Sequence, residues 1–131
     1  MDELKDKIIK KVEMEEDQTI VFTTKDGEKI AYVAYGDCCS TSWFAHIAGL
    51  KNLLGQRIVE VKERQEWTKK EIATAEAEGD YESLSLYGYL LKTKKGTCDI
   101  EFRNESNGYY GGNAELSSVP SGKLKEIKKD F

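Results

Sequence analysis

Cysteine is scarce in this chain, and its spacing is typical neither of a metal site nor of a disulfide framework. The 131 residues contain three cysteines, of which Cys38 and Cys39 are adjacent. Adjacent cysteines rarely bridge each other, and an odd number leaves one unpaired. A zinc site would have to combine these two with Cys98 and the only histidine, His46, and no CxxC pair supports it. We therefore expect reduced thiols, no metal or other cofactor, and one or two thiols buried as small apolar side chains.

The chain also lacks a long apolar run and an excess of positive charge. No apolar run approaches the roughly 18 residues of a membrane-spanning helix, and the first residues have no signal-peptide pattern. The formal net charge of -4 argues against bulk binding to nucleic acid or to a membrane surface. We therefore expect a cytoplasmic protein with no membrane partner. The length fits a single domain that spans residues 1–131.

Strand patterns dominate the first third of the chain. Residues 19–35 are rich in β-branched and aromatic side chains on both sides of Asp26-Gly27. This pattern predicts a hairpin with a two-residue type I′ turn, which needs positive φ at both turn positions. Further strands are expected at residues 7–14, 57–63 and 109–116.

A second hairpin is predicted by residues 83–93 and 98–103, with Gly88 as a candidate bulge in the longer strand. Its turn, residues 93–96, resembles the turn of the first hairpin, residues 24–27, in sequence and in position. Duplication of a half and ordinary hairpin composition explain this similarity equally well. In either case two strand-rich halves follow.

Three helices are expected between and after these strands. Apolar residues at spacings of three and four predict a central helix over residues 41–54. A short exposed helix is expected around residues 69–76, and Leu124, Ile127 and Phe131 suggest a C-terminal docking helix. The predicted fold class is therefore α+β. A mostly antiparallel sheet, built from two hairpin-containing halves, would pack on one central helix and end with a short C-terminal helix.

The densest cluster of reactive side chains follows the first hairpin. It holds two thiols, a carboxylate, three hydroxyls and an indole, from Asp37, Cys38, Cys39, Ser40, Thr41, Ser42 and Trp43. At the start of the expected helix, the hydroxyls and backbone N–H groups would face an anion such as a phosphate or a carboxylate. N-capping is the simpler explanation of the serine and threonine hydroxyls, but capping requires neither cysteine.

A second cluster follows the second hairpin. Asp99, Glu101 and Arg103 alternate on one strand face, which is either a solvated surface or the wall of a polar cleft. Arg103 would then donate to a phosphate in bidentate fashion. Amide groups, stacking rings and flexible backbone come next, from Asn104, Asn107, Tyr109, Tyr110 and Gly111. Because each cluster follows the return strand of its hairpin, we expect the two to meet at one site.

Catalysis is the least supported interpretation of these clusters. A cysteine at the expected helix start would have a lowered pKa, and His46 could serve as its base. Asp99 and Glu101 could form an acid–base pair, although ordinary strands show this spacing constantly. No GxGxxG or P-loop pattern is present. We therefore favour a protein that is not an enzyme, with a thiol-dependent or acid–base hydrolase as a remaining alternative.

The paired motifs resemble those of a known family. Residues 35–44, with the sequence YGDCCSTSWF, and residues 98–112, with CDIEFRNESNGYYGG, are similar to motifs of a family of small phage and prophage proteins. That family is classed as a domain of unknown function. The resemblance implies a phage protein that works in the cytoplasm of a bacterial host, and it supplies no chemistry to transfer.

The leading hypothesis from the sequence is a non-enzymatic binder of a small anionic, nucleotide-like molecule, which would sequester a defence signal of the host. The first cluster would hold the charged part, and Trp43, Tyr109 and Tyr110 would stack on a base. The alternative is an inhibitor or accessory factor that binds a host protein. The sequence leaves the oligomeric state open, a homo-oligomer included.

Overall fold

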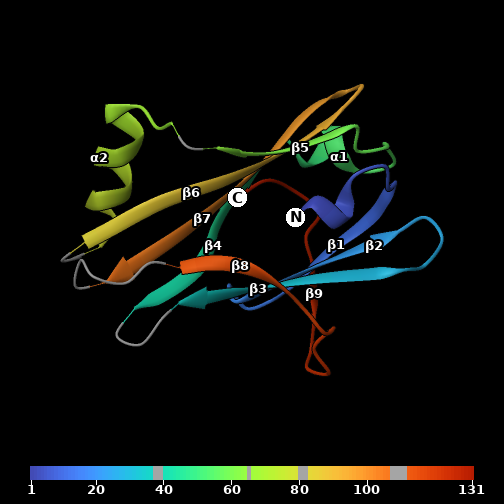
Figure 1. Ribbon diagram of the computed structural model, residues 1–131, viewed down its shortest axis with the longest axis horizontal. Coiled ribbons are helices and arrows are strands. Elements are labelled where there is room, and N and C mark those ends of the chain that lie inside the picture. Colours follow the sequence, from blue (N-terminus) through green and yellow to red (C-terminus); the bar gives the residue numbers. More distant parts are fainter. Residues whose placement is uncertain (37–39, 65, 80–82, 107–111) are drawn as a thin grey trace.

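Two antiparallel sheets form the protein (Figure 1). The computed structural model describes residues 1–36, 40–64, 66–79, 83–106 and 112–131. In chain order the elements are η1 (Asp2–Leu4), β1 (Ile9–Glu15), β2 (Thr19–Thr24), β3 (Lys29–Gly36), β4 (Thr41–Ala48), α1 (Leu50–Leu53), β5 (Glu60–Arg64), α2 (Lys69–Ala77), β6 (Ser83–Thr93), β7 (Gly96–Ser106), β8 (Gly112–Ser117) and β9 (Lys125–Glu126). The first sheet has the order β8-β3-β2-β1-β9, and the second has the order β4-β7-β6-β5.

Each half of the chain forms a three-stranded meander, and its fourth strand pairs with a strand of the other half. Strands β1, β2 and β3 pair in sequence, but β4 leaves them and pairs with β7. Strands β5, β6 and β7 also pair in sequence, and β8 returns to pair with β3. The prediction of two hairpin-containing halves is confirmed at this level. The exchange of the fourth strands joins the halves.

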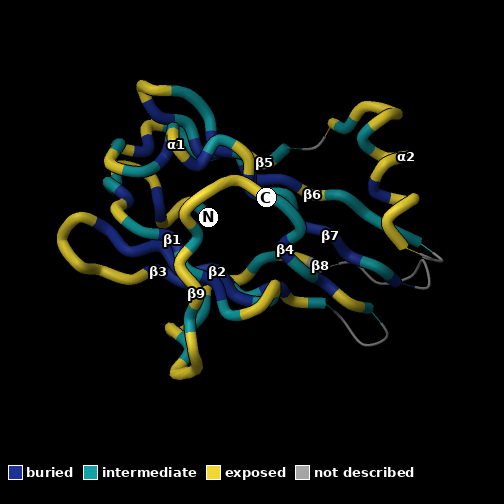
Figure 2. The backbone as a smooth tube through the Cα atoms, turned by 180° about the vertical axis from the view of Figure 1, so that it is seen from behind, coloured by how far each residue is buried: buried dark blue, intermediate teal, exposed yellow. Residues whose placement is uncertain are grey.

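The core lies between the sheets. Phe22 and Tyr32 of the first sheet and Phe44 and Phe102 of the second belong to one cluster of buried side chains, and in each sheet the two rings meet edge to face. Cys98 belongs to the same cluster, which confirms that one thiol is buried as a small apolar side chain. Strand β2, which lies between β1 and β3 at the centre of the first sheet, is buried along its whole length (Figure 2).

The turn of the first hairpin differs from the prediction. Thr24 donates its N–H to the carbonyl of Glu28 (2.8 Å), and Gly27 donates to the carbonyl of Thr24 (3.0 Å). Gly27 has φ of 90°, whereas Asp26 does not have positive φ. The loop is therefore a three-residue loop with one left-handed residue, and the type I′ prediction is wrong.

The predicted central helix is wrong over most of its length. Residues Thr41–Ala48 form strand β4, and only Leu50–Leu53 are helical, after Gly49 with φ of 88°. The register of β4 shifts between Phe44 and His46, so that Phe44 and Ile47 both face the core although they lie three residues apart. This bulge in a strand reproduces the apolar spacing of a helix, which misled the prediction.

The predicted C-terminal helix is also wrong. Residues Lys125–Glu126 form the short strand β9 against β1 instead, and Phe131 exchanges two backbone hydrogen bonds of 3.1 Å with Ile47 of β4. The apolar side chains of the tail are held by an extended segment that runs from one sheet to the other. The exposed helix α2 is confirmed, with Thr68 and Glu71 forming a capping box.

No helix among the described residues has the length and apolar character needed to cross a membrane.

Candidate functional site

Described residues of the two sequence clusters pair with one another in β4 and β7, and the strands that adjoin the clusters pair in β3 and β8. Gly36 at the end of β3 pairs with Gly112 at the start of β8, and Ser42 of β4 pairs with Asn104 of β7. The connecting residues 37–39 and 107–111 lie outside the described part of the chain. They contain the predicted site residues Asp37, Cys38, Cys39, Asn107, Tyr109, Tyr110 and Gly111. The described residues on both sides of these connections are thus paired neighbours.

The inner face of the second sheet becomes polar at this end. Along β7 the core side chains Ile100 and Phe102 are followed by Asn104, which is fully buried. Its Nδ2 donates to Ser42 Oγ at 2.8 Å, and its Oδ1 has no hydrogen-bond partner among the described residues. A buried oxygen without a donor costs free energy, so this position suits a ligand or a water that donates a hydrogen bond.

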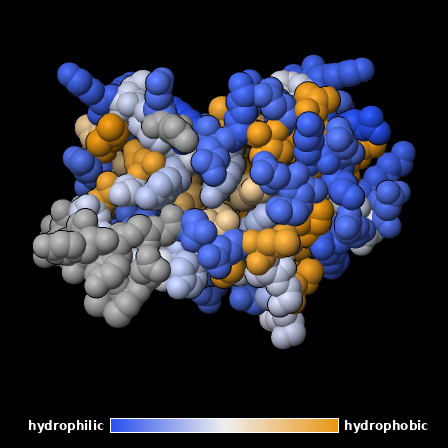
Figure 3. All heavy atoms as spheres, in the orientation of Figure 1, coloured by the Kyte–Doolittle hydropathy of each residue, from blue (hydrophilic) through white to orange (hydrophobic). Residues whose placement is uncertain are grey.

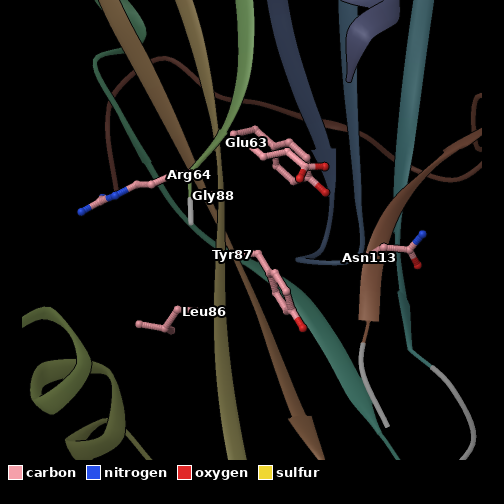
Figure 4. A pocket seen from close by; sticks show the side chains of 7 residues that line it. Glu63, Arg64, Leu86, Tyr87, Gly88 and Asn113 are labelled. Carbon is pink, nitrogen blue, oxygen red and sulfur yellow. The ribbon is translucent and has the colours of Figure 1, made fainter. Parts of the chain in front are cut away.

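A pocket of about 330 Å³ opens between the two sheets near this polar end (Figure 4). Tyr87 and Asn113 reach it from β6 and β8, and Glu63 joins them from β5. Tyr87 is 36% exposed, and the other part of its ring packs on Phe102 with centroids 5.7 Å apart. The pocket therefore offers one ring face together with an amide and a carboxylate, and Arg64, Leu86 and Gly88 also line it.

Tyr89 forms the inner wall of this pocket. Its hydroxyl accepts a hydrogen bond from the N–H of Ala114 at 3.4 Å, which links β6 to β8 across the space between the sheets. Burial raises the pKa of Tyr89, so the hydroxyl stays protonated at neutral pH. It therefore keeps a proton to donate.

Arg64 covers the outer side of β6 and is already paired. It donates to Asp99 (2.9 Å) and to both oxygens of Glu71 in α2, and its guanidinium lies 4.1 Å from the ring centre of Trp67. Gly88 lies beneath this stack, and a Cβ there would approach Arg64 Cβ to 2.9 Å. The register of β6 with β7 runs through Gly88 without a shift, so the predicted bulge is wrong and close packing explains the glycine.

Arg103 is also paired, and the expectation that it lies open to a ligand needs correction. The residue is 4% exposed. Its Nε donates to Glu101 (2.6 Å) and its Nη1 to Glu78 (2.7 Å). His46 Nε2 lies 3.9 Å from Glu78 and 4.0 Å from Glu101. The polar face of β7 is thus covered at this point by the end of α2 and is not a free wall of a cleft.

Strand β4 separates residues that the sequence had grouped. Ser42 lies on the inner face beside Asn104, whereas Trp43 pairs with Arg103 and lies on the outer face. Thr41 is exposed, and Ser40 is half-buried. Because these residues begin a strand, no helix dipole acts there, and the predicted helix-start anion site needs correction on this point.

Tyr87, Tyr89, Glu63 and Asn113 were not predicted as site residues. The period-two alternation of residues 83–89 places both tyrosines on one face of β6, and this was the available signal. The strand exchange decides which face of β6 points inward. It also decides that β8 lies opposite that face. The pocket could therefore not be assembled from the pattern of one strand.

Cys98, the cysteine that the structure describes, is poorly suited to nucleophilic catalysis. Burial raises the pKa of Cys98 to about 12, which makes this thiol a poor nucleophile at neutral pH. Among the residues that the structure describes, no three or more His, Cys, Asp or Glu side chains are grouped to hold a metal ion. That Cys38 and Cys39 are reduced and bind no metal remains a prediction.

These features define a two-sheet antiparallel β protein with a polar pocket at the edge between its sheets. The chain belongs to the family described as Domain of unknown function (DUF7448), which matches residues 2–116. Comparison with curated proteins and with solved structures finds no match. The family match ends within β8, so β9 and the tail follow it.

Proposed function

We propose that this protein is a non-enzymatic binder of a small, ring-containing molecule with nucleotide-like chemistry. The observation that supports it best is the Oδ1 of buried Asn104 beside Ser42, which has no hydrogen-bond partner among the described residues. A pocket of about 330 Å³ lies between β6 and β8, and this volume is within the range of small-molecule sites.

In this proposal the aromatic ring of the ligand stacks on Tyr87. Tyrosine gives rigid contact area at a low cost in conformational entropy, and the exposed part of this ring faces the pocket. Asn113 can both donate and accept hydrogen bonds, and Glu63 can accept them from an amine or a ribose hydroxyl. A purine or pyrimidine edge offers both kinds of group.

The negative part of such a ligand would be held without a free arginine. Arg64 and Arg103 each already contact two carboxylates. Backbone N–H groups and hydroxyls are the remaining donors, and consecutive backbone N–H groups form anion sites in many proteins. We therefore assign the charged end of the ligand to backbone N–H groups and hydroxyls near Ser42, which lies on the inner face of the same sheet as Tyr87.

Sequestration of a signalling nucleotide is the role that this binding mode would serve. A binder without catalytic groups acts by stoichiometric capture, and a phage protein could remove a defence signal of its bacterial host in this way. The phage origin in this proposal rests on the resemblance of the sequence motifs. A cytoplasmic location belongs to the same proposal.

The alternative, an inhibitor that covers a host protein, would require a broad apolar surface. On the face shown in Figure 3, hydrophobic residues form small groups that hydrophilic residues interrupt. Of the large exposed hydrophobic side chains among the described residues, those of β3, β8 and the segment after β8 are near one another, and the others come from different elements. The whole set is Tyr35, Val59, Ile72, Tyr87, Leu116, Val119 and Phe131.

Capture from a bacterial metabolite extract tests the proposal. The protein is incubated with the extract, washed, denatured, and the released molecules are identified by mass spectrometry. The Tyr87→Leu variant should bind a captured nucleotide at least fivefold more weakly, since stacking contributes about 1–3 kcal/mol per base. Phe131→Leu removes a ring of similar exposure elsewhere and should bind normally. Release of no ring-containing molecule, or equal affinity of Tyr87→Leu and wild type, contradicts the proposal.

A further inference from the structure

Helix α2 docks on the outer face of the second sheet mainly through charged groups. Figures 1 and 2 both place it at the end of that sheet where β6 begins and β7 ends, away from β1 and β2. Of its nine residues only Ala75 is buried, and none belongs to the buried core cluster. Its largest apolar side chain, Ile72, is 39% exposed. Apolar burial therefore contributes little to the docking of α2.

Two glutamates at the ends of the helix bind two arginines of the sheet. Glu71 and Glu78 lie seven residues apart, which is about two turns, so both side chains leave from one side of the helix. Glu71 accepts hydrogen bonds from Arg64 of β5 at 2.6 and 2.7 Å. Glu78 accepts one from Arg103 of β7 at 2.7 Å. We call these two arginine–glutamate pairs the latch.

The first pair of the latch also completes the helix. The oxygen of Glu71 that accepts from Arg64 at 2.7 Å also accepts the N–H of Thr68 at 3.0 Å, and this bond closes the capping box. A helix of nine residues is shorter than the roughly 12–15 residues that an isolated helix needs in water. The helix and its contact with the sheet should therefore form and break together.

The sheet holds a second partner for each arginine of the latch. Arg64 also donates to Asp99 at 2.9 Å. Arg103 also donates to Glu101 at 2.6 Å. Both of these acids belong to β7 and stay in place when α2 leaves. Departure of the helix would thus leave no arginine charge unpaired in the sheet, which keeps the cost of opening low.

We propose that α2 is a charge-latched cover, which unfolds and leaves the second sheet as one unit while both sheets stay folded. In the closed form Glu78 covers Arg103, which is 4% exposed. In the open form Arg103 becomes accessible on the outer face, where it lies opposite Trp43 of β4. The inference does not depend on the ligand proposed above, and its tests require no ligand.

Hydrogen exchange followed by NMR tests the proposal on the unmodified chain. The amides of residues 72–78 should be about a hundredfold or more less protected than those of β2, the buried central strand of the first sheet. Exchange in α2 should depend weakly on added urea, whereas exchange in β2 should rise steeply, because urea favours states that expose more surface. Equal protection of α2 and β2, with the same urea dependence, would mean that α2 opens only when the whole protein unfolds, and would overturn the proposal.

Charge variants test the latch. Glu71→Gln and Glu78→Gln should each raise the exchange rate of the α2 amides by about fivefold, because each removes an ion pair. Glu76→Gln is the matched control, since Glu76 is an exposed acid of the same helix that contributes to neither pair of the latch. It should leave the exchange rate as in wild type. An equal effect of Glu76→Gln and the latch variants, or no effect of the latch variants, contradicts the proposal.

Modification by phenylglyoxal, followed by peptide mass mapping, tests whether α2 leaves as one unit. Glu71→Gln does not touch Arg103, yet it should make Arg103 react about fivefold faster, since loss of either pair releases the whole helix. Arg57 forms a bridge with Ile8, outside the latch, and should react at one rate in wild type and in the variant. An unchanged reaction rate of Arg103 in Glu71→Gln would show that the two ends of α2 open separately, and would overturn the proposal.

Discussion

Replacing Arg103 with alanine should destabilise the fold strongly, in contrast to what its place in a polar sequence motif indicates. The guanidinium is 4% exposed and donates to Glu101 and Glu78 at 2.6 and 2.7 Å. Removing one partner of a buried ion pair typically costs about 3–5 kcal/mol, because the other charge is left without compensation. Glu78 is 43% exposed and can turn to water, so we expect a loss of about 2–4 kcal/mol.

Chemical denaturation followed by circular dichroism measures this loss directly. For a domain of this length, about 3 kcal/mol corresponds to a fall in Tm of roughly 10 °C. Glu78→Gln is the matched control, since it changes the exposed partner and should cost no more than about 1 kcal/mol. Arg103→Met should be as unstable as Arg103→Ala, and adding Glu101→Gln should recover part of the loss.

The pH dependence supplies a second readout of the same pair. The hydrogen bond from Arg103 lowers the pKa of Glu78, although burial of this carboxyl acts in the opposite direction. A lowered pKa contributes stability that is present above about pH 4.3 and is lost as the pH falls through the folded-state pKa. Arg103→Ala should therefore lose less stability on acidification than wild type. A Tm within 2 °C of wild type at pH 7 would refute the reasoning.

Three further predictions concern backbone and burial. Gly27→Val should lower the free energy of unfolding by about 1 kcal/mol or more because φ is 90°, and Gly27→Asn should lower it less. No atom lies within 4 Å of a Cβ at this position, so a steric clash would not explain the loss. Equal losses in the two variants would therefore argue against backbone strain. Burial raises the pKa of Cys98 from 9.0 to about 12, so the free energy of unfolding should fall as the pH rises above about 9. Denaturation at pH 8 and at pH 10 should show a smaller fall for Cys98→Ala than for wild type. Gly88→Ala should cost about 1–3 kcal/mol by displacing Arg64, and normal stability with unchanged tryptophan fluorescence would disprove the close packing.

The sequence predicted those elements whose local pattern and tertiary environment agree. Strand β6 was predicted with its observed bounds because eleven residues show strand composition without interruption. Helix α2 was predicted because composition is a local property, and the capping box found at its start is local as well. Strand β4 was not predicted, because one bulge changes the spacing of its apolar residues from two to three. The tail was not predicted either, since its partners Val12 and Ile47 lie far away in the sequence.

The same distinction explains how much of the candidate site was predictable. That the two motifs meet followed from their equivalent places after two hairpins, and the pairing of Ser42 with Asn104 agrees with it. The sequence did not predict which side chains share a face, because side chains are arranged differently on the expected helix than on the observed strand. Trp43 and Arg103 consequently lie on the outer face, where acids and α2 surround the arginine.

The strand exchange links the fold to the proposed binding site. If each fourth strand stayed with its own half, the two connections would close separate sheets at separate places. Because β4 pairs in the second sheet and β8 in the first, β8 lies opposite β6, and the Tyr89 hydroxyl accepts a hydrogen bond from the N–H of Ala114. Ser42 of β4 and Asn104 of β7 thereby lie side by side on the inner face of the second sheet. A change that breaks the pairing of Gly36 with Gly112 should therefore disturb ligand binding before it disturbs the core, which lies on the other side of Phe102.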